Sequence, residues 1–268
     1  MNNIKIIFSD VDKTLVPNFD LSFSQKLIKG LKILKKKDIL FVLSSGRPTI
    51  NLIEIAKKIN KENNEDLIKY VCGYNATEIY DVINNKYIYK DEISIENTKK
   101  INEILEQENI DYINYTLDTI YSNNPDNKYG LIEGQIFAKN PEKLVDILPT
   151  PKVLGLVSEN IEQKMEIIQN KLPDFSISTS TPYFLEVTNK NINKGTGMLK
   201  LIEILGIKQE ETMAFGDGGN DIEMIKYAKV GITLENGTDS VKKVADIILN
   251  QSVNEDAVAN FILEKFNV

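Results

Sequence analysis

A short apolar segment near the start of the chain, residues 4–8, constrains the fold more than any other feature. Its isoleucines and phenylalanine favour a strand that is buried on both faces, as at the centre of a parallel sheet. The segment runs into Asp10 and Asp12, and residues two apart on extended backbone point to the same side. The two carboxylates are therefore expected to leave the end of the strand as a pair.

Paired carboxylates at a strand end suit a particular kind of ligand. Open α/β sheets bind ligands beyond the carboxyl ends of their strands. Two carboxylates at that place repel each other unless a cation or a proton lies between them. Asp10 and Asp12 therefore predict a site for a divalent cation and a phosphate ester, and an Asx turn that closes the strand is the alternative.

The same succession of apolar and polar residues continues along the chain. Apolar runs at residues 39–43 and 70–72 are separated by segments with helical spacing. Alternating strands and helices predict an α/β fold with parallel strands and right-handed crossovers. The pattern then changes to strands and helices of an α+β type, and the alternation resumes later. We expect a doubly wound parallel-sheet core of residues 1–81 and 183–268, with an inserted α+β domain of residues 82–182.

Three shorter patterns predict individual elements. Ser22 and Gln25 match a capping box, so a helix is expected to begin after Ser22 as its N-cap. The apolar residues within 131–138 predict a strand. Residues 86–89 predict a further strand, which we assign to the inserted domain.

Composition excludes several classes of protein. The net charge of -7 and the pI of about 5.0 disfavour nucleic-acid binding, which needs a basic surface. Cys72 is the single cysteine, so an internal disulfide and a cysteine zinc site are impossible. The sequence shows neither a charged leader with an apolar stretch nor a run long enough to span a bilayer. We expect a cytoplasmic protein with no membrane partner, and the sequence does not determine its oligomeric state, although a monomer is compatible with it.

The chain contains no histidine. A general acid or base must therefore be a carboxylate, a lysine, a tyrosine or the cysteine. Catalysis by a Ser-His-Asp triad and metal sites with histidine ligands are excluded. Magnesium held by carboxylates remains possible.

Further polar residues lie at predicted element boundaries. Ser45 follows the second strand, Asp217 and Asp221 follow the strand at residues 212–215, and Lys194 lies at a predicted helix start. In a parallel sheet these positions share one edge. Singly, Ser45 matches a helix cap, Lys194 a solvated lysine and the glycine-rich residues after Phe215 a tight turn. Together they favour a single site.

These motifs resemble those of the haloacid dehalogenase superfamily. The resemblance rests on Asp-Val-Asp-Lys-Thr at residues 10–14, Ser-Ser-Gly-Arg-Pro at 44–48, Lys194 with Gly195, and Gly-Asp-Gly-Gly-Asn-Asp at 216–221. The inserted domain resembles a type C2B cap, as in the Cof-like phosphatases. The chain departs from the family pattern at Lys13 and Ala257, where glycine is usual, and at Asn75-Ala76-Thr77, where Asn-Gly-Ala is usual.

The resemblance implies a phosphatase that acts on small phosphate monoesters such as sugar phosphates. Asp10 would be the nucleophile that forms an aspartyl phosphate, and Asp12 the general acid and base. Magnesium would be the cofactor, held by Asp10, the backbone carbonyl of Asp12 and Asp217, with Asp221 as a ligand or a support. The residues implied to bind or position the phosphoryl group are Thr14, Ser45, Gly46, Arg47, Lys194 and Asn220.

Two other functions remain open on the sequence. The chain could be a phosphomutase or phosphotransferase that passes the phosphoryl group to a sugar hydroxyl. It could also be a non-catalytic module that binds phosphate, because a fold does not determine a function. The physiological substrate and the cap residues that select it follow no motif in the sequence.

Arg47 is the only arginine of the chain and lies beside Ser45. A guanidinium can bind an oxyanion through two parallel hydrogen bonds, which lysine cannot. We therefore hypothesise that Arg47 reaches a polar group of the substrate or a carboxylate of the cap. The alternative is an arginine that only holds its own loop.

Overall fold

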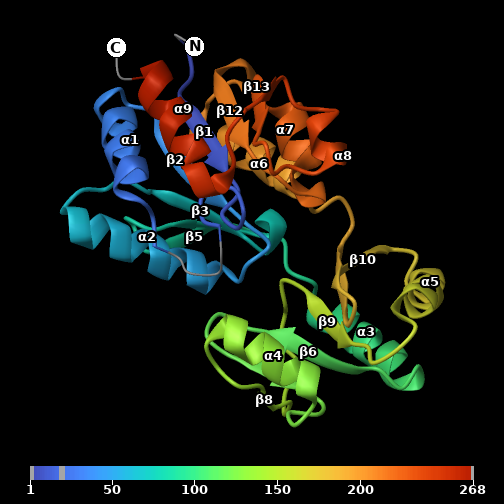
Figure 1. Ribbon diagram of the computed structural model, residues 1–268. Helices are drawn as coiled ribbons and strands as arrows, with labels where there is room; N and C mark the ends of the chain where they lie inside the picture. Colours follow the sequence, from blue (N-terminus) through green and yellow to red (C-terminus); the bar gives the residue numbers. More distant parts are fainter. Residues whose placement is uncertain (1–2, 18–21, 267–268) are drawn as a thin grey trace. The chain divides into compact units, whose positions relative to one another are not determined.

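The computed structural model describes residues 3–17 and 22–266, which divide into two compact units (Figure 1). Unit 1 comprises Met1–Tyr89 and Asn193–Val268, and unit 2 comprises Lys90–Ile192. Unit 2 is thus inserted between the two segments of unit 1. The expected domain boundaries at residues 82 and 182 both lie earlier in the chain than these divisions.

Unit 1 is built on an eight-stranded sheet with the order β14-β13-β12-β1-β2-β3-β4-β5. Its strands are β1 (Ile6–Ser9), β2 (Leu40–Ser44), β3 (Tyr70–Gly73), β4 (Glu78–Asp81), β5 (Lys86–Lys90), β12 (Thr212–Phe215), β13 (Val230–Thr233) and β14 (Ile247–Ile248). Neighbouring strands from β14 to β3 are parallel, whereas β4 is antiparallel to β3. The predicted α/β fold with a parallel-sheet core is confirmed.

Side chains of β1 alternate between two hydrophobic clusters, one on each face of the sheet. Ile7 belongs to the first cluster, and Ile6 and Phe8 belong to the second. The first face is covered by α1 (Gln25–Lys36), α2 (Thr49–Asn63) and α9 (Ala257–Phe266), and the second by α6 (Lys194–Leu205), α7 (Ile222–Tyr227) and α8 (Asp239–Lys242) (Figure 1). Because both faces are covered, β1 is fully buried, as its apolar sequence predicts.

Short 3-10 turns connect several of these elements. They are η1 (Tyr74–Ala76), η2 (Gln209–Glu211), η3 (Gly219–Asp221) and η4 (Val253–Glu255). Two of them belong to the loops of the site described below: η1 directly follows β3, and η3 begins four residues after the end of β12.

Unit 2 contains a six-stranded sheet with the order β10-β11-β9-β6-β7-β8. Its elements are α3 (Ile95–Gln107), β6 (Asp111–Tyr115), β7 (Ile120–Ser122), α4 (Lys128–Phe137), β8 (Glu142–Lys143), β9 (Val153–Leu156), α5 (Ile161–Lys171), β10 (Phe175–Thr181) and β11 (Phe184–Asn189). Residues of α3 and α5 pack with the central strands in one hydrophobic cluster. Among the helices that the structure describes in either unit, none is both long and apolar enough to cross a bilayer.

The strand predicted at residues 86–89 exists, but it belongs to the sheet of unit 1. β5 follows β4 after a turn in which the Asp81 carboxylate accepts hydrogen bonds from the backbone amides of Ile83 (3.1 Å) and Asn84 (2.9 Å). This turn returns the chain to the edge of the unit 1 sheet. Periodicity predicts a strand without indicating which sheet it joins, and the division accordingly falls near the end of β5, after Tyr89.

Two local predictions are wrong. Residues 131–138 lie largely in the helix α4, which begins after Asn127, whose side chain accepts from the backbone amides of Tyr129 and Gly130. The buried residues of α4 recur at helical spacing, and this packing outweighs the strand preference of its isoleucines. The N-cap of α1 is Ser24, whose hydroxyl oxygen accepts from the backbone amide of Leu27 at 3.1 Å, and not Ser22.

Unit 2 buries a small group of ionisable side chains. The Tyr115 hydroxyl donates to the Glu133 carboxylate at 2.6 Å, and Lys152 forms an ion pair with Glu186 at 3.1 Å. Burial raises the pKa of the Glu133 carboxyl group, against the opposing effects of Lys152 and Tyr115. A buried carboxyl group with a raised pKa stabilises the fold below its ordinary pKa and loses that contribution as the pH rises through its folded pKa.

Glu133→Gln is therefore expected to stabilise unit 2 at alkaline pH. Glutamine has nearly the same shape, accepts the Tyr115 hydroxyl and carries no charge that burial would penalise. The melting temperature should rise relative to wild type at about pH 8, and the gain should shrink towards about pH 5, because the raised pKa favours proton binding by the wild-type carboxyl group as the pH falls. Glu142→Gln, at an exposed position of β8, is the matched control and should show no such pH-dependent gain. A variant less stable than wild type at both pH values would contradict the assignment.

Candidate active site

The register of the parallel strands brings three loops to one edge of the unit 1 sheet. Ser9 at the end of β1 lies opposite Leu43 of β2 and Phe215 of β12. Asp10 and Asp217 therefore leave neighbouring strands at nearly the same level, and Ser45 follows on the other side of β1. The edge beyond the carboxyl ends of parallel strands is the usual ligand site of such sheets.

An acidic cluster lies at this edge. Carboxylate oxygens of Asp10, Asp217 and Asp221 all lie within 4.8 Å of one another, and all three residues are buried. The ammonium group of Lys194, which is fully buried, donates to Asp10 Oδ1 at 2.5 Å and to Asp221 Oδ1 at 2.7 Å. Lys194 is the first residue of α6. The structure thus brings together four of the residues that the sequence motifs singled out.

Burial and crowding change the protonation of these groups. Burial raises the pKa of Asp10 to about 7, although Lys194 lowers it, and the nearby carboxylate of Asp221 adds to the rise. Burial also raises the pKa of Asp217. Burial alone would lower the pKa of Lys194, but the carboxylates of Asp10 and Asp221 raise it overall, so the ammonium form persists. The cluster therefore contains one positive charge among three carboxyl groups.

The donor set fits a magnesium ion. Three carboxylates surround one ammonium group, so the ionised cluster carries an excess of negative charge that a divalent cation would neutralise. Among the described residues, no hydrogen-bond donor engages Oδ2 of Asp10 or Oδ2 of Asp217, so one oxygen of each is available as a ligand. The backbone carbonyl of Asp12, which the family resemblance implies as a further ligand, would add a third oxygen.

Asp221 acts mainly as a support of the loop that carries Asp217. Its Oδ2 accepts from the backbone amides of Asp217 at 3.0 Å and Gly218 at 2.9 Å, and its Oδ1 accepts from Lys194. Thr14 also holds this loop, because its hydroxyl donates to Asp217 Oδ1 at 2.7 Å. Both carboxylate oxygens of Asp221 are thus occupied by the protein itself.

Arg47 pairs with Asp12. Its Nε and Nη2 donate to the two carboxylate oxygens of Asp12 at 2.7 Å and 2.6 Å. The side chain of Arg47 is 9% exposed and that of Asp12 is 29% exposed. The guanidinium of Arg47 therefore binds a carboxylate within unit 1, that of Asp12. Asp12 is neither the substrate group nor the cap carboxylate that we hypothesised as a partner. The two hydrogen bonds fix the orientation of the Asp12 carboxylate.

Ser45 and Asn220 lie on the flanking loops. Ser45 is buried, and its hydroxyl oxygen accepts from the backbone amide of Arg47 at 3.2 Å, which leaves the hydroxyl proton able to bind an anion. Asn220 lies in η3, and its side chain donates to the side-chain oxygen of Asn75 at 3.0 Å. Gly46 lies beside Asn75, since a Cβ atom built on it would be 3.4 Å from the Asn75 amide oxygen.

Sequence reasoning missed Asn75 as a residue of this site. Asn75 follows the end of β3, the strand next to β2, so its position at a strand end was the signal that could have identified it. It matches the asparagine of the Asn-Gly-Ala family pattern, but the resemblance attached no role in the chemistry to that pattern.

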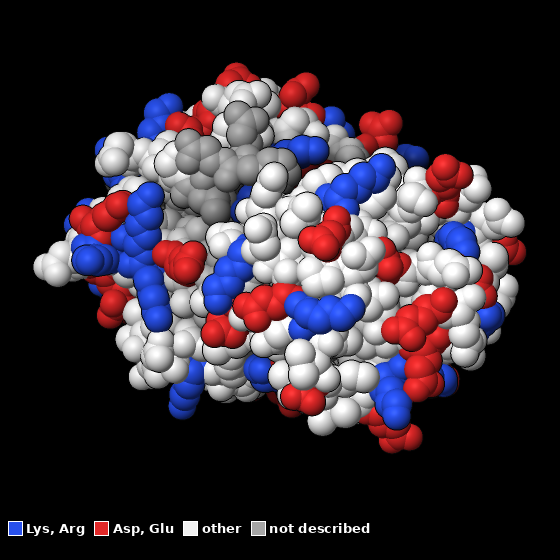
Figure 2. Space-filling view, turned by 90° about the horizontal axis from the view of Figure 1, so that it is seen from below, with Lys and Arg blue, Asp and Glu red and all other residues white. Residues whose placement is uncertain are grey.

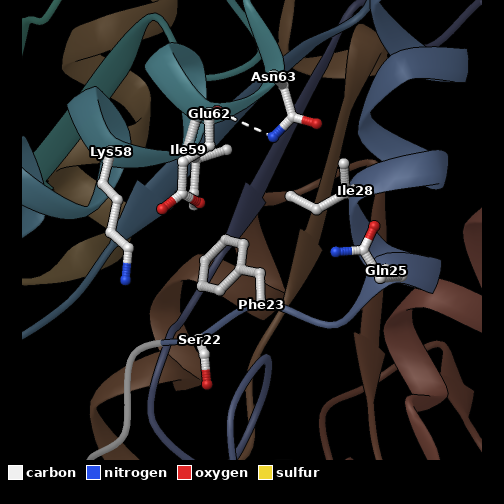
Figure 3. A pocket seen from close by; sticks show the side chains of 8 residues that line it. All are labelled: Ser22, Phe23, Gln25, Ile28, Lys58, Ile59, Glu62 and Asn63. Carbon is white, nitrogen blue, oxygen red and sulfur yellow. Dashed lines mark hydrogen bonds between the residues drawn. The ribbon is translucent and has the colours of Figure 1, made fainter.

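A cavity of about 380 Å³ lies elsewhere in unit 1, between the start of α1 and α2 (Figure 3). Its lining contains none of the predicted site residues: it consists of Ser22, Phe23, Gln25, Ile28, Lys58, Ile59, Glu62 and Asn63. Its two charged residues, Lys58 and Glu62, do not form a cluster like that of Asp10, Asp217, Asp221 and Lys194 at the strand ends. We therefore choose the acidic cluster as the candidate site because of its ionisable side chains, and not the cavity because of its volume.

Comparison with known proteins agrees with the motifs and the geometry. A family described as haloacid dehalogenase-like hydrolase matches residues 7–262. The chain belongs to this family. The predicted membership is confirmed, and with it the prediction of an enzyme, a hydrolase of the haloacid dehalogenase type.

Relatives within the family match the chain over nearly its whole length. The 5-amino-6-(5-phospho-D-ribitylamino)uracil phosphatase of Bacillus subtilis is 27% identical over 97% of this chain and 95% of its own. A haloacid dehalogenase-like hydrolase from Bacteroides thetaiotaomicron has a similar structure, with a TM-score of 0.84 and 27% identity over 98% of this chain and 100% of its own. A sugar phosphatase of HAD subclass IIB gives a TM-score of 0.78 and 25% identity over 98% and 99% of the two chains.

Proposed function

We propose that the protein is a magnesium-dependent phosphatase that hydrolyses small phosphate monoesters through an aspartyl phosphate on Asp10. The observation that carries this proposal is the contact between Lys194 and Asp10 within the acidic cluster, because it supports Asp10 as the nucleophile beside a cation suited to phosphate and carboxylates suited to a metal. The names of the relatives, a phosphatase of a phosphorylated ribityl compound and a sugar phosphatase, support the same class of substrate.

In the first half-reaction a carboxylate oxygen of Asp10 forms a bond to phosphorus, and the bond from phosphorus to the leaving oxygen breaks. Asp12 gives a proton to the leaving oxygen. Lys194 and the hydroxyl of Ser45 bind the phosphoryl oxygens, whose charge is spread in the transition state. A bound magnesium ion would neutralise charge on the phosphoryl group and on the carboxylates.

The second half-reaction releases phosphate. Asp12, now ionised, takes a proton from a water molecule whose oxygen attacks phosphorus, and the bond from phosphorus to Asp10 breaks. Arg47 orients the ionised carboxylate of Asp12 in this step through its two hydrogen bonds. Thr14 and Asn220 position the loop of Asp217 and the strand-end loops around it.

We further propose that unit 2 is the cap of this enzyme and supplies the residues that select the leaving group. Its α+β architecture and its insertion within unit 1 support this role. Cap closure in such enzymes excludes water and completes the site.

The experiment that tests the proposed function is phosphate release from a panel of phosphate esters, with magnesium and with a chelator. The panel should contain hexose and pentose phosphates, ribityl phosphates and nucleotides. We expect magnesium-dependent release of free phosphate from at least one class. Conversion of a sugar phosphate without free phosphate would indicate a phosphotransferase, and binding without conversion would indicate a phosphate-binding module.

Arg47→Lys tests the role of the fork at Asp12. Lysine keeps the charge but offers a single donor point, so it cannot hold both carboxylate oxygens in one plane. We expect kcat/KM to fall at least about 10-fold, with little change in melting temperature. Steady-state kinetics on the best substrate of the panel measures the loss.

The matched comparison is the double variant Arg47→Lys with Asp12→Asn. If Arg47 acts through Asp12, the double variant should be no slower than Asp12→Asn alone, because the two residues share one function. Independent, multiplicative losses would instead indicate that Arg47 contacts the substrate directly.

A further inference from the structure

The loop after β3 contains three consecutive non-glycine residues in the left-handed region. The φ angles are 50° at Tyr74, 55° at Asn75 and 72° at Ala76. Asparagine tolerates this region, but tyrosine and alanine do not favour it, because their Cβ atoms crowd the following carbonyl oxygen. Backbone of this kind persists only where its surroundings hold it, and it is concentrated at functional sites.

The surroundings of this turn are the other loops of the site. The backbone amide of Tyr74 donates to the carbonyl of Arg47 at 2.9 Å, and that of Asn75 donates to the carbonyl of Ser45 at 2.9 Å. On its other side the turn packs on α6, since a Cβ atom on Gly197 would lie 1.9 Å from the Cβ atom of Ala76. The left-handed turn is therefore fixed between the Ser45 loop and the helix that begins with Lys194.

The side chain of Asn75 connects this turn to a third loop. Its oxygen accepts the amide of Asn220 at 3.0 Å, and Asn220 lies next to Asp221 in the loop of the acidic cluster. Asn75 is partly exposed, and within the described part of the chain no hydrogen bond engages its own amide nitrogen. Asn75 thus links three loops: its backbone amide bonds the loop after β2, and its side chain bonds the loop after β12.

We infer that Asn75 is a positioning residue for phosphoryl binding, which acts by holding Asn220 and the Asp217 loop at a fixed distance from the Ser45 loop. The inference rests on the proposed function and adds to it a residue on a fourth strand end. The strained turn supplies the rigidity, because its backbone is bonded to the Ser45 loop. The ligand class is a phosphoryl oxyanion, and inorganic phosphate is its simplest form.

Asn75→Gly tests the role of the Asn75 side chain separately from that of the backbone turn. Glycine adopts a φ of 55° without strain, so the variant removes the side chain while the turn remains. We expect the dissociation constant of inorganic phosphate, measured by calorimetry with magnesium present, to rise about 10-fold, a loss of about 1.4 kcal/mol. The melting temperature should change little. Asn64→Gly is the control, because Asn64 is an exposed asparagine with a φ of 49° at the end of α2.

A double-mutant cycle with Asn220→Ala decides whether Asn75 acts through Asn220. Phosphate binding to the double variant should be no weaker than to Asn220→Ala alone, within about twofold. Wild-type affinity in Asn75→Gly, or losses that multiply in the double variant, would overturn the inference. The proposed function is judged separately by ester hydrolysis in the wild type, so an inactive wild type that binds phosphate would refute the function and still decide the role of Asn75.

Discussion

Asp10→Asn is expected to abolish phosphate release from every ester that the wild-type enzyme hydrolyses. An amide oxygen is a poor nucleophile, and no other described carboxylate both contacts Lys194 and retains an unengaged oxygen. The loss should be about 10⁴-fold or more, as for the removal of other nucleophiles. Asparagine has nearly the shape of aspartate and keeps an oxygen for the Lys194 bond, so the fold should remain. Phosphate release and the melting temperature measure the two effects.

Asp12→Asn is the matched control for this experiment. It removes a carboxylate two residues away at the same strand end, but the nucleophile remains. Loss of a general acid and base typically costs about 10² to 10⁴-fold in rate. Intact-protein mass spectrometry after rapid quenching should show a phosphorylated chain with Asp12→Asn and none with Asp10→Asn. Turnover by Asp10→Asn would exclude the covalent mechanism.

The sequence predicted those parts of the site that depend on strand register. Asp10, Ser45 and Asp217 each come shortly after an apolar strand, so a parallel sheet brings them to one edge whatever the details of packing. Lys194 was predicted from its motif at a helix start, and the structure buries it between carboxylates. The membership of the family followed from the same four motifs and is confirmed.

Other features depend on long-range contacts that the residue pattern does not contain. The sequence could not identify Asp12 as the partner of Arg47, because several carboxylates were possible partners. The choice depends on how the loops after β1 and β2 lie relative to each other. Asn75 was missed because no chemical role was attached to the end of β3, and its bond to Asn220 depends on long-range geometry. The left-handed φ angles of Lys13 and Ala76, 61° and 72°, explain why glycine is usual at both positions. The helix α4 was predicted as a strand because its apolar residues suit either structure until packing decides.

Lys194→Met should have the second large effect, on stability as well as on catalysis. Lys194 is fully buried, and its ammonium group bonds two buried carboxylates, those of Asp10 and Asp221. Methionine fills a similar volume without charge. Removing one partner of a buried ion pair typically costs about 3–5 kcal/mol, because the remaining charge is left uncompensated. The free energy of unfolding, measured by denaturant titration with a chelator present, should fall by this amount.

Catalysis in Lys194→Met should fall about 10² to 10³-fold, the usual cost of losing one donor to developing charge. Lys29→Met is the matched control, because Lys29 lies on the exposed face of α1, and it should change neither property. Magnesium should stabilise Lys194→Met more than it stabilises the wild type, since the cation would compensate carboxylates that have lost their ammonium partner. A variant of wild-type stability in the chelator would show that the carboxylates do not need Lys194, and equal stabilisation of both proteins by magnesium would place the cation away from this cluster.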